Sequence, residues 1–292
     1  MIDKNDHFVF GFSKLDIMFG HAEPQAVRLP YANFAKSGVQ LIQQTITKID
    51  PVAKSVTTDA GSYAADYLVV ALGADYDWDA TPGLPDAHEF YTTAGAERLR
   101  DVLSNFTRGH ALIGVCGAPY KCPPAPSECA LMLHDYLERK GVRAACEISL
   151  VLPLPSPVPP SPETSRALVA AFAERDIKFY PSKRVVAVDA TRKIASLDDE
   201  SEMAFELFLG VPKHRAPSVV LDSGLAENGW VTVNPRTLET KYPGVYAVGD
   251  GANTGTPKAG VFAEGAAKAV ASALIAKVRN GGVSREFDGF GT

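Results

Sequence analysis

The sequence from His110 to Gly141 constrains the fold more than any other stretch, because it has the pattern of a strand, a tight turn and a helix. Residues 111–115 form a short apolar run that is typical of a buried parallel strand. A helix is predicted over residues 124–140, with prolines in its first turn and Gly141 as its C-terminal stop. Units of this kind build α/β domains around parallel sheets.

Cys122 directly precedes this predicted helix and is the candidate catalytic residue of the unit. The partial positive charge of a helix N-terminus and the full charge of Lys121 both favour the thiolate form. A strand-to-helix turn of an α/β protein usually holds a phosphate, whereas this turn holds a cysteine among prolines. Cys116, Cys129 and Cys146 are expected to be buried core thiols, with Cys116 the best internal alternative as a partner for Cys122.

Length and composition exclude several classes of protein. The chain has 292 residues, enough for two domains, and its net charge of -5 without a basic stripe argues against nucleic-acid binding. No apolar run reaches the roughly 18 residues of a membrane-spanning helix. Four clustered cysteines, without paired CxxC spacing and histidines, argue against a disulfide scaffold and predict no metal site.

Residues 66–73, with the sequence DYLVVALG, predict a second buried strand. This strand ends at Gly73, where the backbone can approach a ligand closely because glycine has no side chain. Many α/β strands end in glycine, so this segment alone is weak support for a binding site.

A third strand is predicted over residues 245–248 and ends in Gly249 and Asp250. An acid at the carboxyl end of a parallel strand lies where α/β folds bind their ligands. Lys258 precedes a predicted helix over residues 259–277, whose N-terminus supplies a positive field for an electron-rich ring. The alternative is that Asp250 is a turn aspartate and Lys258 a surface lysine.

The first three residues, Met1-Ile2-Asp3, have the pattern of the end of a strand. In a dinucleotide-binding unit the second strand ends in an acid that binds a ribose hydroxyl, and Asp3 fits that role. The alternative is that Asp3 is a solvated acid near a chain terminus.

The central strand–turn–helix unit lacks the glycine pattern of a nucleotide site. Gly114, Gly117 and the following Pro119 do not match the GxGxxG spacing of a dinucleotide-binding turn. Pro153 and Pro155 stand after the next predicted strand, where an acid or an arginine is needed. We therefore expect a dinucleotide-type fold that has no nucleotide fingerprint.

Taken together, these segments resemble the FAD-dependent pyridine nucleotide-disulfide oxidoreductase superfamily. The resemblance is greatest to the branch of sulfide:quinone oxidoreductases and flavocytochrome c sulfide dehydrogenases, and it covers nearly the whole chain. It depends on DYLVVALGA (66–74), GAPYKCPPAPSEC (117–129), GVPKHRAP (210–217), SGLAENGWVTVNPRTLET (223–240), PGVYAVGD (243–250) and PKAGVFAEGAAKAV (257–270).

The resemblance implies an α/β fold of two Rossmann-like three-layer domains. It implies a discontinuous FAD-binding domain over residues 1–90 and 216–292, which lacks its first strand, and a second NAD(P)-like domain over residues 91–215. The implied FAD-binding residues are Asp3 at the adenosine ribose, Ala71 and Gly73 beside the cofactor, Gly249 and Asp250 at the ribityl chain and pyrophosphate, and Lys258, Ala259 and Gly260 at the flavin pyrimidine edge.

The implied activity is the oxidation of sulfide, or of a related small sulfur compound, through Cys122 and FAD. The resemblance gives Cys122 and Lys258 the catalytic roles, with Lys258 raising the flavin potential, and implies a quinone or a cytochrome haem as the electron acceptor. Two alternatives stay open: an NAD(P)H-dependent flavin oxidoreductase, and a catalytically inactive truncated fragment.

Two departures from the family pattern concern the ends of the chain. The glycine-rich FAD phosphate turn is expected before Asp3, and a partner cysteine and an amphipathic membrane-binding segment are expected after Thr292. We therefore expect a chain truncated at both ends that binds FAD weakly or not at all and has no turnover. The implied location is cytoplasmic or peripheral to a membrane, or periplasmic if a signal precedes the chain. The sequence leaves the oligomeric state open.

Overall fold

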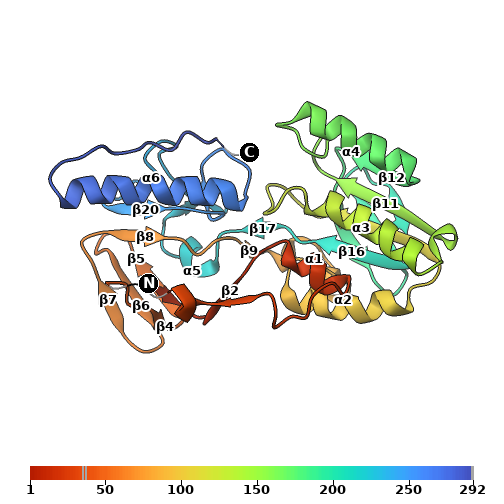
Figure 1. Cartoon of the computed structure of the whole chain (residues 1–292), viewed down its shortest axis with the longest axis horizontal. Helices are drawn as coiled ribbons and strands as arrows, with labels where there is room; N and C mark the ends of the chain where they lie inside the picture. The colour runs from red at the N-terminus through yellow and green to blue at the C-terminus, as the bar shows by residue number, and fades with distance from the viewer. Residues whose placement is uncertain (35, 37, 291–292) are drawn as a thin grey trace. The chain divides into compact units, whose positions relative to one another are not determined.

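The computed structural model describes residues 1–34, 36 and 38–290. The chain forms two compact units, which alternate along the sequence and can be followed by colour in Figure 1. The first unit contains Met1–Phe8, Leu29–Tyr76 and the chain from His214 onward. The second contains Val9–Arg28 and Asp77–Lys213.

The second unit is built on a four-stranded parallel sheet in the order β12-β11-β10-β16. Its strands are β10 (Gly109–Val115), β11 (Cys146–Leu152), β12 (Ile177–Pro181) and β16 (Leu207–Val211). Ile113 lies opposite Leu150 on one side and Leu209 on the other, and all three are fully buried. The apolar run at residues 111–115 therefore forms a central strand, as its sequence predicts.

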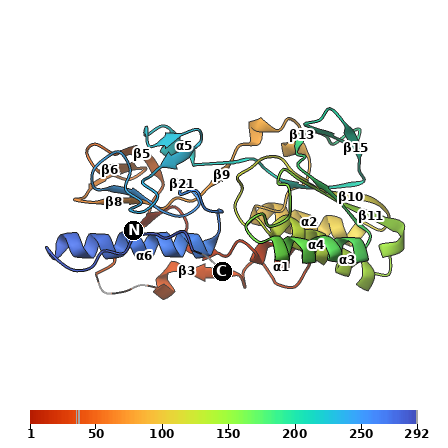
Figure 2. The same cartoon turned by 90° about the horizontal axis from the view of Figure 1, so that it is seen from above.

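Helices cover one face of this sheet, and a second sheet covers the other (Figure 2). The helices are α1 (Ser13–Met18), α2 (Thr93–Asn105), α3 (Ala125–Arg139) and α4 (Pro162–Glu174). The second sheet is antiparallel, with β13 (Val185–Asp189), β14 (Ile194–Leu197) and β15 (Glu202–Ala204). Short 3₁₀ turns are η2 (Trp78–Ala80), η3 (Leu84–Asp86) and η4 (Arg143–Ala145).

The first unit combines small sheets of two or three short strands with one long helix. It contains β1 (Ile2–Asp3), β4 (Ile42–Gln43), β5 (Ile46–Asp50), β6 (Ser55–Thr58), β7 (Ser62–Ala64), β8 (Leu68–Val70), β9 (Asp75–Tyr76), β17 (His214–Arg215), α5 (Ser218–Leu221), β18 (Ala226–Glu227), β19 (Trp230–Thr232), β20 (Val245–Ala247), β21 (Ala252–Asn253) and α6 (Gly260–Val278). Where the chain passes between the units, β2 (His7–Val9) pairs with β3 (Arg28–Pro30), which leads into η1 (Tyr31–Phe34). β1 pairs with β4, and β8 with β20, in parallel.

α6 runs along β20 and closes the core of the first unit (Figure 1). Ala266, Ala269 and Val270 on the helix are buried against Tyr246 and its neighbours in β20. The small residues of α6 allow this close packing. No helix in the described part of the chain combines the length and the apolar character that crossing a membrane requires.

The α/β architecture of two Rossmann-type units confirms the predicted fold class. The division between the units lies elsewhere than the predicted domain bounds. Residues 9–28 belong to the second unit, because Leu15, Ile17 and Met18 of α1 are buried there and α1 packs on α2. Residues 77–90 belong to it as well, with Leu84 in its core.

Candidate functional site

The predicted ligand-binding strand ends of the first unit lie next to each other. In the β8–β20 pair, Val70 lies opposite Ala247, and Val248 N donates a hydrogen bond to Val70 O at 3.0 Å. Residues 71–73 and 249–251 therefore leave the sheet at the same edge. This edge is the carboxyl end of parallel strands, where α/β folds bind their ligands.

Three glycines allow the two strand ends to come together. Gly73 and Gly249 have φ angles of +69° and +77°, which a residue with a side chain adopts only with strain. A Cβ atom on Gly251 would lie 2.7 Å from Gly73 O, closer than such atoms approach one another. A Cβ on Gly73 would have no neighbour within 4 Å, so this backbone faces open space.

The N-terminus of α6 lies at the same strand end. A Cβ on Gly249 would lie 3.8 Å from Ala263 Cβ, in the first turns of the helix. Ala259 is the N-cap residue and Gly260 begins the helix, which runs for 19 residues. Two glycine strand ends beneath a helix N-terminus form a cradle that suits an anionic group such as a pyrophosphate.

Lys258 is buried in this region rather than exposed on the surface, with only 7% of its surface accessible. Its Nζ donates hydrogen bonds to Asp250 O at 2.6 Å and to Ala252 O at 3.3 Å. Burial lowers the pKa of Lys258 to about 8, while the negative charge of Asp250 opposes this shift. The ammonium therefore fastens the segment between the end of β20 and the start of α6.

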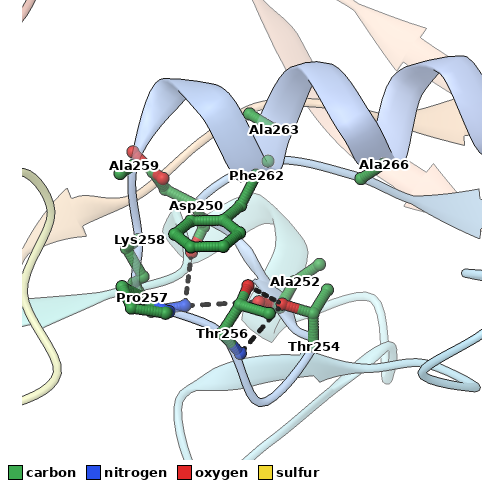
Figure 3. Close-up of a pocket in the computed structure, with 11 residues that line it drawn as sticks. Asp250, Ala252, Thr254, Thr256, Pro257, Lys258, Ala259, Phe262, Ala263 and Ala266 are labelled. Carbon is green, nitrogen blue, oxygen red and sulfur yellow. Dashed lines mark hydrogen bonds between the residues drawn. The ribbon is translucent and has the colours of Figure 1, made fainter. Parts of the chain in front are cut away.

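Figure 3 shows a small cavity under this segment, with the Lys258 side chain reaching toward Asp250 and Ala252. With about 10 Å³ of space inside, the cavity has room for about one water molecule and is too small for a flavin ring. Thr254 Oγ1 and Thr256 Oγ1 are 2.7 Å apart on its wall. The open side of Gly73, next to the first turns of α6, has room for a larger ligand.

Asp3 lies at the end of β1, as predicted, but β1 pairs with β4 and not with β8 or β20. Its carboxylate accepts hydrogen bonds from Asn5 N at 2.8 Å and from the Tyr31 hydroxyl at 3.0 Å. Burial of the phenol raises the pKa of Tyr31 to about 12, and the negative charge of the Asp3 carboxylate adds to this shift. A strand-end acid is thus present, while the ribose-binding role of Asp3 stays a prediction.

Cys122 belongs to the second unit and lies in the turn that enters α3. Its φ angle of +53° is unusual for a residue with a side chain. Its carbonyl accepts hydrogen bonds from Ala125 N at 3.0 Å and from the Tyr91 hydroxyl at 3.3 Å. The Tyr120 hydroxyl bonds to the next carbonyl, at Pro123. The sequence predicts the place of this cysteine before the helix but not the contacts that hold the turn.

The four cysteines, none of which forms a disulfide with another described residue, differ sharply in exposure. Cys116, Cys129 and Cys146 are buried, as expected, and only Cys122 is partly exposed. Burial raises the pKa of Cys116 to about 12 and raises the pKa of Cys129 as well. A thiol with a raised pKa in an apolar core reacts poorly, which leaves Cys122 as the candidate redox thiol.

We expect one of the four thiols to react with iodoacetamide at neutral pH within minutes, and all four after unfolding in guanidinium chloride. The reason is that reaction requires an accessible thiolate, which burial denies to Cys116, Cys129 and Cys146. Mass spectrometry of the digested protein identifies the labelled residue. Rapid native labelling of a buried cysteine in place of Cys122 would contradict this description of the site.

The proline-rich loop after β11 folds onto the start of α4. Ser165 Oγ donates to Val158 O at 2.8 Å and accepts from Val158 N at 3.0 Å. Ser182 N donates to Leu154 O at 3.0 Å, which fixes the other end of the loop. The loop thus occupies the carboxyl end of β11, where a dinucleotide-binding unit carries the residue that recognises the adenosine ribose.

Several residues near the predicted sites were not found from the sequence. Trp230 contacts Lys258 although the two are far apart in the chain, and its segment entered the sequence analysis only as part of the family resemblance. Gly251 could have been found, because it completes a Gly-Asp-Gly run at a strand end. Tyr91 and the two cavity threonines have no local pattern that indicates their contacts.

Two α/β units, one with glycine strand ends beneath a helix N-terminus, define the dinucleotide-binding class of proteins. A model of the family pyridine nucleotide-disulphide oxidoreductase matches residues 1–273. The chain therefore belongs to the pyridine nucleotide-disulphide oxidoreductase family. This result confirms the resemblance to that family stated from the sequence.

Individual relatives are similar at low identity. The mitochondrial sulfide:quinone oxidoreductase of Mus musculus is 26% identical over 269 residues, which cover 87% of this chain and 60% of that protein. The sulfide-quinone reductase of Aquifex aeolicus is 26% identical over 299 residues, covering 94% and 67%. An X-ray structure of the sulfide:quinone oxidoreductase from Aquifex aeolicus has a TM-score of 0.84 at 24% identity, covering 96% of this chain and 70% of that one.

Proposed function

We propose that the protein containing this chain oxidises sulfide by means of Cys122 and FAD and transfers the electrons to a quinone. The observation that carries the proposal is the placement of Cys122, the one partly exposed thiol, in a turn at the N-terminus of α3. The similarity to sulfide:quinone oxidoreductases supports the choice of substrate and acceptor. A cytochrome is the alternative acceptor, and a lipid-soluble quinone implies contact with a membrane surface.

The first unit provides a set of residues that fits FAD. Gly73, Gly249 and the first turn of α6 surround an open backbone cradle for the pyrophosphate, with Asp250 beside it. In this proposal Ala71 lies along the cofactor, and Ala259 and Gly260 direct helix amides toward its electron-rich edge. FAD, when bound, supplies a ring that accepts two electrons.

The second unit provides the sulfur-carrying residue. The positive field at the start of α3 favours the thiolate of Cys122, which is the reactive form. In the proposed step the S–H bond of the Cys122 thiol and one S–H bond of hydrogen sulfide are broken, and an S–S bond forms between Cys122 Sγ and the sulfide sulfur to give a persulfide. The two protons pass to solvent, and the two electrons would pass to FAD, the oxidant of this step. A quinone takes up two electrons and two protons, so sulfide and quinone yield zero-valent sulfur and a quinol.

The structure favours sulfide over NADH as the electron donor. The proline-rich loop between Pro153 and Ser165 follows β11 and is bonded to the start of α4, at the strand end where the adenosine ribose of a nicotinamide nucleotide would be recognised. No acid follows β11 to bind a ribose hydroxyl. An NAD(P)H-dependent flavin oxidoreductase is therefore the less favoured alternative.

The protein containing this chain, reconstituted with FAD under anaerobic conditions, distinguishes the two donors. We expect sulfide to bleach the flavin absorbance and a soluble quinone to restore it, because sulfide reaches Cys122 and a quinone is the proposed acceptor. We expect NADH at the same concentration to bleach it far more slowly. Rapid bleaching by NADH without a response to sulfide would overturn the proposed function.

A further inference from the structure

Trp230, on β19, contacts the one buried lysine of the candidate flavin site. Its indole ring lies face-on to Lys258, with Nζ 3.5 Å from the ring centroid. Both side chains are buried, at 9% and 7% exposure, so little water screens the contact. A cation over the face of tryptophan is attracted by the ring quadrupole, most strongly where water is excluded.

The remaining contacts of Lys258 Nζ determine what this cation holds in place. Nζ donates to Asp250 O at 2.6 Å and to Ala252 O at 3.3 Å, and both carbonyls belong to the segment that joins β20 to α6 (Figure 3). The indole of Trp230 thus lies against the Lys258 ammonium, while the two carbonyls bind this ammonium to the segment between β20 and α6. A shift of Lys258 would release the backbone at Asp250.

The protonation state of Lys258 makes its contact with Trp230 dependent on pH, which can be measured. Burial lowers the pKa of Lys258 to about 8, and the Asp250 carboxylate is the charged group among the described residues whose field raises it. β19 contributes the neutral indole, which favours the charged form. Lys258 is therefore a cation below this pH and a neutral amine above it.

We propose that Trp230 is a positioning residue of the flavin site, which holds the Lys258 ammonium against the Asp250 and Ala252 carbonyls and thereby fixes the loop that leads into α6. Trp230 acts through Lys258 and the loop rather than by contact with FAD. The inference deepens the proposed function, since it rests on FAD binding at the cradle of Gly73, Gly249 and α6.

Tryptophan fluorescence tests the contact in the FAD-free chain. The only other tryptophan is Trp78, so Trp78→Phe isolates the emission of Trp230. We expect this emission to change with a midpoint at a pH of about 8 as the charge leaves the ring face. The step should vanish in Trp78→Phe/Lys258→Met, and Trp78→Phe/Lys258→Arg should keep a constant charge and a flat profile.

A flat profile in Trp78→Phe, or a step that survives Lys258→Met, would overturn the proposal. Neither outcome depends on sulfide turnover, so a failed sulfide assay with an intact fluorescence step refutes only the proposed function.

A second measurement tests the consequence for the cofactor. We expect Trp230→Leu to weaken FAD binding at least about tenfold, and Trp230→Phe, which retains an aromatic face, to recover most of the affinity. Titration of each folded variant with FAD gives the dissociation constants. Equal affinity in wild type and Trp230→Leu would contradict a positioning role, and so would an equal loss in both variants.

Discussion

Replacing Cys122 by serine is expected to lower sulfide-dependent quinone reduction by at least about a thousandfold, because a hydroxyl is not ionised at neutral pH and cannot accept sulfur reversibly. Cys122 is partly exposed, whereas the other three thiols are buried, so no other cysteine can replace it without rearrangement of the core. Initial rates are compared at equal FAD content, which separates the loss of chemistry from the loss of cofactor.

Cys146→Ser is the matched control. Cys146 begins β11 in the same unit and is buried. The variant therefore makes the same replacement of sulfur by oxygen at a cysteine that takes no part in the proposed reaction. We expect this variant to retain most of the wild-type rate at equal FAD content. Comparable rates in Cys122→Ser and wild type would remove Cys122 from the reaction.

Gly251→Ala is expected to have the second largest effect, on FAD binding and on stability together. The new Cβ would lie 2.7 Å from Gly73 O, so the two strand ends must separate. Overpacking of this kind costs about 1–3 kcal/mol of folding free energy, and the displaced backbone is the proposed pyrophosphate cradle. We expect FAD affinity to fall at least about tenfold, as measured by titration of the native variant with FAD. A separate chemical denaturation curve establishes which fraction of the variant is folded.

Gly61→Ala controls for the substitution itself. Gly61 belongs to the same unit, and a Cβ there would meet no atom within 4 Å. We expect its FAD affinity and its stability to stay close to those of wild type. If Gly251→Ala binds FAD as tightly as Gly61→Ala, the close approach of the two strand ends has no role in cofactor binding.

Long local patterns predicted the main elements. The apolar run at residues 111–115 and the prolines and glycine around α3 correspond to β10 and α3 within one or two residues. The start of α6 follows Lys258, as predicted. These elements have strong signals of their own, because buried parallel strands and helix ends need particular residue types.

Features fixed by distant contacts were not predictable. α1 has six residues and no side-chain cap, and its burial on α2 assigns residues 9–28 to the second unit. Two-residue strands such as β1 and β9 exist only through their pairing. The contact between Trp230 and Lys258 joins two segments whose proximity depends on the whole unit.

The central proposal is that the sulfur of sulfide is held on Cys122 as a persulfide once its two electrons have passed to FAD. Its most direct test is mass spectrometry of the FAD-loaded protein after one anaerobic addition of sulfide, with alkylation to trap persulfides. We predict that the peptide containing Cys122 gains one sulfur atom while the flavin absorbance is bleached. Bleaching of the flavin with no added sulfur on Cys122, or with the sulfur on Cys116, would contradict the claim.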